Sequence, residues 1–199
     1  SVQEGLNGIG KDFNASNDYN IAFNGSLVSE DFKTGLSLFG FHRKRDPFDA
    51  NGDEFSELAL IENVTIGGQM YQRVSQRGKI SLNYFHINES RRGGNDFHLP
   101  HHEADISESV DHRINSGALN FDLLMREHDK FSAFVSGQNI HRDSYYGAEQ
   151  DPSAYGLTRD LTYSAGIQYI READFFLLSP ATLTGGLESN GGSLTDEKL

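Results

Sequence analysis

The sequence predicts an all-β protein: an antiparallel up-and-down transmembrane β-barrel, of which the chain forms a partial barrel of about eight long meander strands. Three observations support this fold class. Apolar and polar residues alternate with a period of two, and helical periodicity is nearly absent. Several alternating stretches exceed the roughly 5–6 residues usual for globular strands and reach the roughly 9–11 of a tilted membrane strand. Short and long connections alternate between them, as in outer-membrane barrels.

The first four strands are predicted at Tyr19–Val28, Phe32–Arg45, Leu58–Val74 and Lys79–Glu89. In the first, "NIAFNGSLV" sets apolar Ile21, Phe23 and Leu27 against polar neighbours. In the second, "GLSLFGF" alternates in the same way, except that both of its phenylalanines fall on the polar face. We expect such breaks near strand ends, where a strand leaves the hydrocarbon.

The last four strands are predicted at Ile106–Leu124, Phe131–Tyr145, Leu161–Ile170 and Ala181–Glu188. The stretches "ALNFDLL", "LTYSAGIQYI" and "ATLTGGLE" each alternate apolar with polar residues. The sixth strand places Phe134 among polar residues. Tyrosines near predicted strand ends fit an aromatic girdle, although soluble sheets share this feature; they are Tyr71, Tyr84, Tyr145, Tyr146, Tyr163 and Tyr169.

The connections alternate in length through the first six. Short connections are expected at Ser29–Asp31, Ser75–Gly78 and Arg126–Lys130, and long ones at Asp46–Glu57, in "NESRRGGNDFHLPHHEAD" and at Tyr146–Asp160. The seventh, Arg171–Pro180, is longer than the alternation requires, and a polar stretch follows from Ser189. This asymmetry is typical of barrels with tight periplasmic turns and longer extracellular loops.

Composition limits the possible functions. The 199 residues carry a net charge of −12, which argues against a nucleic-acid partner because phosphate binding needs clustered Lys and Arg. No cysteine is present, which excludes disulfides, a thiol nucleophile and thiolate metal sites. No apolar run of about 18 residues and no signal peptide is visible. The mean hydropathy of −0.54 is compatible with a barrel, where only alternate residues face lipid.

Four segments carry a family resemblance: "FGFHRKRDPFDANGDEFSEL" (Phe39–Leu58), "GGQMYQRVSQRGKISLNYFHINESRRGGN" (Gly67–Asn95), "PHHEADISESVDHRINSGALNFD" (Pro100–Asp122) and "LTYSAGIQYI" (Leu161–Ile170). They resemble the barrel of TonB-dependent outer-membrane receptors, most of all the cobalamin- and siderophore-receptor-like group of Bacteroidetes-type bacteria. These are strand and loop-edge patterns rather than a catalytic signature, and together they cover most of the chain.

The resemblance implies an uptake receptor in the outer membrane. Such receptors hold a plug domain inside a barrel of about 22 strands. They capture a scarce nutrient such as cobalamin or a ferric siderophore, and a TonB complex driven by the proton gradient moves the plug. Neither a plug, a TonB box nor the usual aromatic-terminated last strand is visible, so we expect residues 1–199 to be an internal part of such a barrel. The expected partners are the small-molecule nutrient, outer-membrane lipid, lipopolysaccharide and, through the plug, the TonB complex.

The histidine-rich loop contains the first candidate binding residues, His98, His101 and His102. Two acids follow, but the spacing is not the zinc-binding HExxH pattern, and Pro100 argues against a helix. The pattern favours a solvated extracellular loop over ligand contact, and ligand contact over a metal site.

Two further pairs complete the candidate set. Arg91 and Arg92 could hold an anionic ligand or a lipopolysaccharide phosphate through bidentate hydrogen bonds, but an inter-loop salt bridge with one of the many nearby acids is favoured. Tyr145 and Tyr146 precede the next long loop and are further candidates for ligand contact.

One loop contains a partial calcium-binding pattern. Asp49, Asn51 and Asp53 match the first alternating oxygen ligands of an EF-hand. Glu54 replaces the required glycine and Leu60 replaces the final glutamate, so the loop is not an EF-hand. A looser calcium site or a solvated acidic turn are the two interpretations.

No nucleophile elbow, paired-acid site or phosphate loop indicates an enzyme. "GLNGIG" (Gly5–Gly10) is not followed by a βαβ pattern and does not predict dinucleotide binding. The alternative to a receptor is a self-contained eight-stranded barrel or soluble β-sandwich that acts as a binding or structural module. A closed barrel would pair its first and last strands, whereas part of a larger barrel would leave both edges open.

Overall fold

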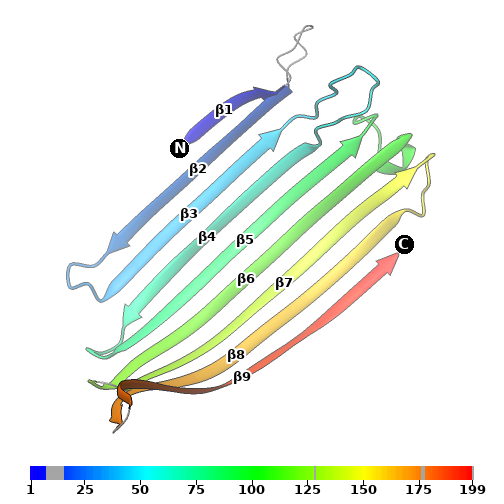
Figure 1. Cartoon of the computed structure of the whole chain (residues 1–199). Coiled ribbons are helices and arrows are strands. Elements are labelled where there is room, and N and C mark those ends of the chain that lie inside the picture. Colours follow the sequence, from blue (N-terminus) through cyan, green and yellow to red (C-terminus); the bar gives the residue numbers. More distant parts are fainter. Residues whose placement is uncertain (8–15, 128, 176–177, 199) are drawn as a thin grey trace.

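The protein forms one antiparallel β-sheet whose strands follow each other in chain order, each paired with the next (Figure 1). The structure, a computed structural model, describes residues 1–7, 16–127, 129–175 and 178–198. The nine strands are β1 (Val2–Asn7), β2 (Ser16–Val28), β3 (Thr34–Arg45), β4 (Leu60–Arg73), β5 (Gly78–Gly94), β6 (Ile106–Arg126), β7 (Asp129–Ala148), β8 (Tyr155–Phe175) and β9 (Leu178–Lys198). A single 3₁₀ turn, η1 (His101–Glu103), lies between β5 and β6.

The predicted all-β antiparallel meander is confirmed. All eight predicted strands are present, and β1 is an additional strand that the sequence pattern does not reveal. In the described ranges, β1 and β9 are unpaired edges, so the sheet is open, and no second sheet packs against it. Among these residues no helix has the length and apolar character needed to span a membrane.

The strands near the C-terminus are longer than predicted. β8 and β9 each have 21 residues, and the polar stretch from Ser189 belongs to β9 rather than to a loop. The seventh connection is also shorter than Arg171–Pro180, because β8 continues to Phe175 and β9 begins at Leu178. The expected loop Tyr146–Asp160 is reduced to residues 149–154. Cross-strand pairing explains these differences, because backbone hydrogen bonds continue where side chains lose their alternation.

The two ends of the sheet differ. The β2–β3, β4–β5 and β6–β7 connections lie at one end, here called the turn end, at the lower left of Figure 1. The longer β3–β4 and β5–β6 connections and the β7–β8 connection lie at the other, here called the loop end. The predicted segregation of short and long connections is therefore present in the fold.

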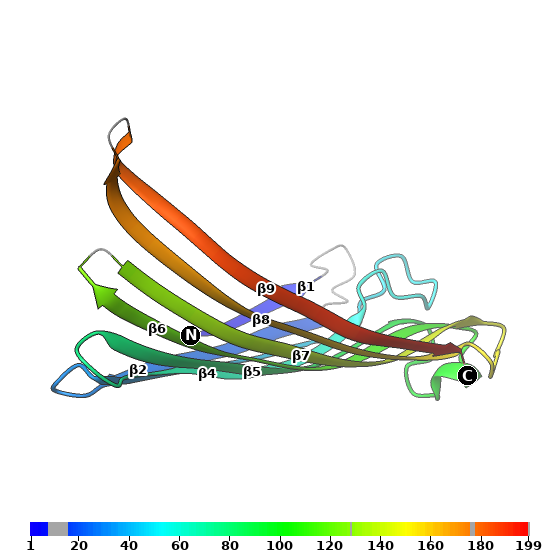
Figure 2. The same cartoon turned by 90° about the horizontal axis from the view of Figure 1, so that it is seen from below.

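The sheet is curved, and its convex face is apolar over the half nearer the turn end. Figure 2 shows the curvature, with η1 on the convex side. The register aligns Leu36, Met70, Leu82, Leu119 and Val135 in one cross-strand row on this face. Neighbouring rows extend the row into what we call the convex band: Phe23, Leu27, Leu36, Leu38, Ile66, Met70, Leu82, Leu119, Phe121, Val135, Leu161, Ile167 and Leu187.

The concave face carries mainly hydroxyl and amide side chains at the same height. They include Asn24, Ser26, Ser37, Gln69, Asn83, Ser116, Asn120, Ser136, Gln138, Thr162, Ser164 and Asn190. Several pair across strands, such as the Ser26 and Ser37 hydroxyls at 2.9 Å. A polar hollow of ≈ 510 Å³ lies on this face between Ser116, Ser136 and Asn190.

The sheet has almost no hydrophobic core. In the described part of the chain, only Ile61, Ala104 and Tyr145 are buried hydrophobic residues. Convex-band side chains such as Val135 and Leu187 are instead 51% and 75% exposed. Because monomeric soluble proteins rarely expose apolar patches of more than a few hundred Å², the convex band requires a cover of some kind.

Two phenylalanines on the mainly polar concave face pack their rings against glycines of the neighbouring strand, which explains why apolar residues occur there. Phe39 lies against Gly67, and Phe134 lies against Gly166, where an added Cβ would come within 2.6 Å of the ring. These pairs lie within the strands, so the expectation that such breaks occur at strand ends is wrong for Phe39 and Phe134. A ring that covers a glycine shields its backbone and secures the register of the two strands.

The predicted aromatic girdle is only partly formed. Tyr84 and Tyr163 lie one row inside the loop-side limit of the convex band, which Ile66 and Leu161 mark, and Tyr169 lies at its turn-side border. Tyr71 and Tyr146 face the concave side instead, and η1 covers Tyr145. The sequence could not separate these groups, because the face of each tyrosine depends on the register.

Filling one glycine site should destabilise the sheet. A Cβ in Gly40→Ala would overlap the ring of Phe23, so we expect a loss of about 1–3 kcal/mol of unfolding free energy. Gly25→Ala is the matched control on the same face, since no atom lies within 4 Å of its added Cβ. Denaturant unfolding of both variants measures the difference, and equal midpoints would contradict this role of Gly40.

Candidate functional site

The predicted binding residues gather at the loop end, but the sheet divides them between its two faces. Consecutive strand residues point in opposite directions, so Arg91 faces the concave side and Arg92 the convex side. For the same reason Tyr146 is concave and Tyr145 convex. The sequence therefore predicts one region that the tertiary structure separates into two.

The convex group is a packed cluster of two histidines and two tyrosines. The His101 ring stacks on the Tyr145 ring, with centroids 6.0 Å apart. The ring centroids of Tyr145 and Tyr155 are 4.7 Å apart. His102 Nδ1 lies 2.9 Å from the Tyr155 hydroxyl. Tyr145 is fully buried, and its hydroxyl donates to the carbonyl of Asp151. We call these four residues the His–Tyr cluster; it attaches the β5–β6 loop to β7 and β8.

Arg92 holds the same loop in place through hydrogen bonds to its backbone. Its guanidinium donates to the carbonyls of Asp96 at 3.0 Å and Leu99 at 2.9 Å. Burial lowers the pKa of His101, and the nearby positive charge of Arg92 lowers it further, so the neutral imidazole is favoured. His98 is exposed on the loop, outside the cluster. The arrangement is that of a loop scaffold, while ligand contact by these residues stays a prediction.

The 3₁₀ turn fits this packing despite the proline before it. Pro100 occupies the N-cap position, where its missing N–H costs no hydrogen bond. Its carbonyl accepts from the Glu103 amide at 3.0 Å, which closes the turn. The expectation that Pro100 excludes a helix holds for a longer helix, but one turn forms.

The concave group lines a hollow of ≈ 480 Å³ that we call the loop-end hollow. It includes the predicted residues Arg91 and Tyr146, and its lining is Ala59, Glu89, Arg91, Gly93, Glu108, Ser109, Val110, His112, Arg142 and Tyr146. Glu89, His112 and Arg142 stand in one direct cross-strand row over β5, β6 and β7. His112 and Arg142 are not among the predicted residues, because only the register brings them beside Arg91.

Charge in the hollow is incompletely paired. Arg91 Nε lies 2.8 Å from Glu89 Oε1, so Arg91 pairs with an acid of its own strand β5 rather than across two loops as predicted. The buried Nε of Arg142 has no hydrogen-bond partner in the described part of the chain. Arg142 also lines the hollow, where guanidinium N–H groups can donate hydrogen bonds to an anionic or carbonyl group of a bound molecule.

Two more arginines lie on the concave face next to the hollow. Arg43 makes a bidentate pair with Asp18 at 3.0 and 2.7 Å, and Arg45 donates twice to the carbonyl of Ala59. Arg43, Arg45, Arg91 and Arg142 thus share the concave face at the loop end, in a chain whose net charge is −12. The loop end of the concave face is the candidate ligand-binding site.

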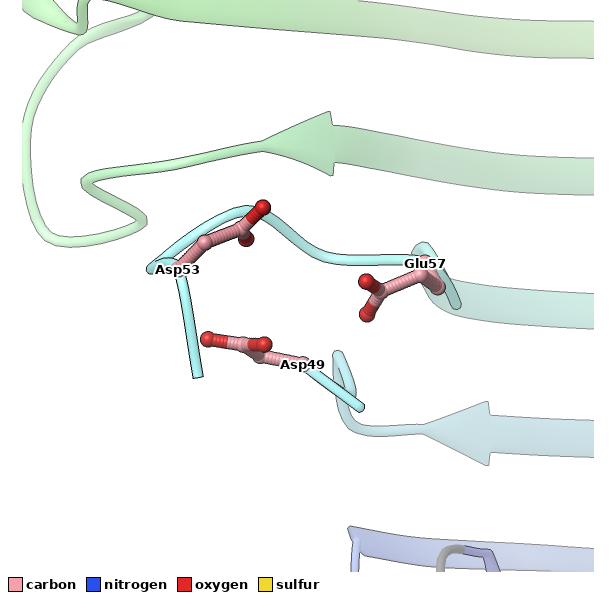
Figure 3. Close-up of side chains that lie close together, drawn as sticks. All are labelled: Asp49, Asp53 and Glu57. Atoms are coloured by element: carbon pink, nitrogen blue, oxygen red, sulfur yellow. The ribbon is translucent and has the colours of Figure 1, made fainter. Parts of the chain in front are cut away.

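The acidic β3–β4 loop brings three carboxylates together (Figure 3). Ligand oxygens of Asp49, Asp53 and Glu57 all lie within 4.8 Å of one another. Glu57 was not predicted, while the predicted Asn51 instead donates to Asp53 at 3.1 Å. Carboxylate oxygens suit calcium, and the calcium site remains a prediction.

Hydrogen bonds within the chain already explain the position of Asp49. Its carboxylate accepts from the amides of Gly52 at 2.7 Å and Glu54 at 2.8 Å. These bonds, that from Gly52 above all, lower the pKa of Asp49. Glu54 adopts φ 68°, and Gly52 adopts φ 80°, so the carboxylate stabilises a tight turn with two left-handed residues.

Comparisons of the chain with protein-family models, with curated proteins and with solved structures give no match.

The acidic loop should loosen at low pH. The pKa of Asp49 is lowered in the folded loop, so its ionised carboxylate stabilises the loop fully at any pH above the ordinary aspartate pKa. This stabilisation disappears as the pH falls through the folded-state pKa. We expect faster amide exchange at Gly52 and Glu54 below that range, after correction for intrinsic rates. Asp49→Ala should show the fast exchange at neutral pH, whereas Glu54→Gln, with an exposed side chain, should resemble the wild type. A pH-independent exchange rate in the wild type would contradict this role.

Proposed function

We propose that the chain forms part of the wall of a TonB-dependent receptor barrel in the outer membrane. The receptor takes up a scarce nutrient such as cobalamin or a ferric siderophore. The observation that carries the proposal is the separation of the two faces: a continuous convex band of exposed aliphatic and aromatic residues lies behind a polar concave face. Hydrocarbon outside and a polar interior are the two environments that such a wall separates.

The dimensions of the convex band support a membrane location. From Leu161 to Tyr169 the band extends about 26 Å along β8, at ~3.3 Å per residue. A strand tilt of about 40° reduces this to about 20 Å of height, close to the roughly 25 Å apolar band of outer-membrane barrels. Polar residues border the band at both ends, such as Arg159 and Arg171 on β8.

The open edges support a wall that continues beyond this sheet. β9 presents a long unpaired edge, and free edges of this length promote aggregation in water. Closure into a barrel with further strands removes them. In this proposal the loop end faces the exterior, and the turn end faces the periplasm.

Ligand capture in the proposed receptor takes place at the loop-end hollow. Arg142 and Arg91 supply cationic donors, Tyr146 supplies an exposed ring, and the hydroxyl- and amide-lined concave face continues below them. Passage of the nutrient then depends on a plug and on the TonB complex, and this chain performs no bond chemistry. Its residues bind and guide the nutrient.

A charge on the convex face should block membrane folding. Val135→Arg places a cation at the centre of the convex band, where a lipid-facing arginine costs about 2–4 kcal/mol. Ser136→Arg is the matched control, because the next residue faces the polar hollow on the concave side. Folding yield into lipid vesicles measures the difference. A soluble binding module would show the smaller cost, or none, for the exposed Val135.

Cysteine labelling tests the proposed topology directly, and residues 1–199 contain no cysteine that would have to be replaced. In cells that produce the whole protein, Asn51→Cys in a long loop should react with an impermeant maleimide from outside, and Ser75→Cys in a turn should not. Leu119→Cys should react only with a lipid-soluble reagent. Equal labelling of Asn51→Cys and Ser75→Cys in intact cells would refute the outer-membrane orientation.

A further inference from the structure

Few groups hold the β5–β6 loop against the strands. Within the part of the chain that the structure describes, no hydrogen bond joins the backbone of residues 100–104 to a strand. Two imidazoles make the polar contacts instead: His101 Nδ1 lies 3.3 Å from the Ser107 hydroxyl, and His102 Nδ1 lies 2.9 Å from the Tyr155 hydroxyl. The polar attachment of η1 to the sheet therefore runs through the His–Tyr cluster.

His101 occupies a site that suits a neutral imidazole. Its ring stacks on Tyr145, which is fully buried. The charged groups that act on it are Arg92 on β5, Asp111 on β6 and the neighbouring His102. Burial lowers the pKa of His101 first, Arg92 and His102 lower it further, and Asp111 only partly offsets them. A proton on His101 therefore costs free energy as long as η1 stays in place.

Two further titratable groups face the cluster. Tyr155 on β8 lies beside His102, whose Nδ1 can accept the phenol proton only while the imidazole is neutral. The Glu103 carboxylate lies 3.9 Å from His102 Nε2, but both side chains are partly exposed, and solvent weakens the attraction. His101 forms no ion pair among the described residues. It is therefore the histidine whose protonation opposes closure of the loop most directly.

We propose that the His–Tyr cluster is an acid-sensitive latch on the β5–β6 loop: protonation of His101 detaches η1 from Tyr145 and releases residues 100–104 from the sheet. Residues 96–99 stay in place, because Arg92 donates to three of their carbonyls whatever the charge of His101. Only the second part of the loop opens. The latch does not depend on the proposed function; with the loop end outside the cell, as proposed, it responds to the pH of the surrounding medium.

The lowered pKa sets the direction of the pH dependence. The closed loop favours the neutral imidazole, whereas His101 in the open loop has the ordinary histidine pKa of 6.5. Closure is therefore most stable above the ordinary pKa, weakens as the pH falls below it, and is weakest below the closed-state pKa. For one histidine, the open fraction can rise by at most about 30-fold between about pH 7.5 and about pH 5.

Hydrogen exchange with single-residue resolution on the whole protein tests the latch, with rates corrected for the intrinsic effect of pH. The Glu103 amide donates to the Pro100 carbonyl within η1, and an isolated turn of this length is not stable once it is detached. Its protection should therefore fall several-fold between about pH 7.5 and about pH 5. The Leu99 amide, which donates to the Asp96 carbonyl in the segment that Arg92 holds, should keep its protection.

Substitutions of His101 separate its charge from its packing. His101→Phe keeps an aromatic ring on Tyr145 but cannot be protonated, so the protection of Glu103 should become nearly independent of pH in this range. His101→Gln provides a second uncharged side chain if the phenyl ring perturbs the loop. His98→Phe is the matched control, because His98 is an exposed histidine of the same loop, and this variant should keep the wild-type response.

Asp111→Asn provides a readout that a merely structural role of His101 would not change. The Asp111 carboxylate favours the charged imidazole in the closed loop, so its removal should make acid opening more extensive. An unaltered acid response in Asp111→Asn would contradict this electrostatic coupling.

Three further outcomes would overturn the latch. They are constant protection of Glu103 across this pH range in the wild type, a full acid response in both His101→Phe and His101→Gln, or an equal loss of protection at Leu99. None of them depends on a membrane location. Cysteine labelling therefore tests the proposed topology independently, and either result can fail without the other.

Discussion

Backbone pairing in a single layer is the constraint on which the rest of the structure depends. In the described residues nine strands form one sheet, and no second layer covers either face. Stability cannot come from an interior, because so few hydrophobic residues are buried. It must come from the ladder of backbone hydrogen bonds and from whatever medium contacts each face. The proposed membrane location would satisfy both requirements, with hydrocarbon on the convex face and polar groups on the concave face.

The strand register decides which side chains face each side of the sheet. A shift by one residue would exchange the faces of a whole strand and move Val135 to the polar side and Ser136 to the apolar side. The aromatic rings that cover glycines, such as Phe134 on Gly166, oppose such a shift, because ring and glycine must remain opposite. Packing of this kind replaces the interdigitated core of a globular domain.

The loop end serves the two faces differently. On the concave side, the register gathers arginines around a hollow in which Arg142 keeps an unused donor. On the convex side, the loop with His101 folds back onto Tyr145. The proposed nutrient site therefore lies on the face that the histidine loop does not contact.

The sequence by itself determined the strand character of the chain, since alternation such as that in "LTYSAGIQYI" depends only on the period of side chains along a strand. It also determined the order of short and long connections. It did not determine where β8 and β9 end, because backbone pairing continues past the last alternating residue. The tertiary structure alone decided that Arg91 joins His112 and Arg142, that Arg92 supports the histidine loop, and that Glu57 joins Asp49. Those groupings depend on cross-strand register and loop folding, which bring together residues distant in sequence.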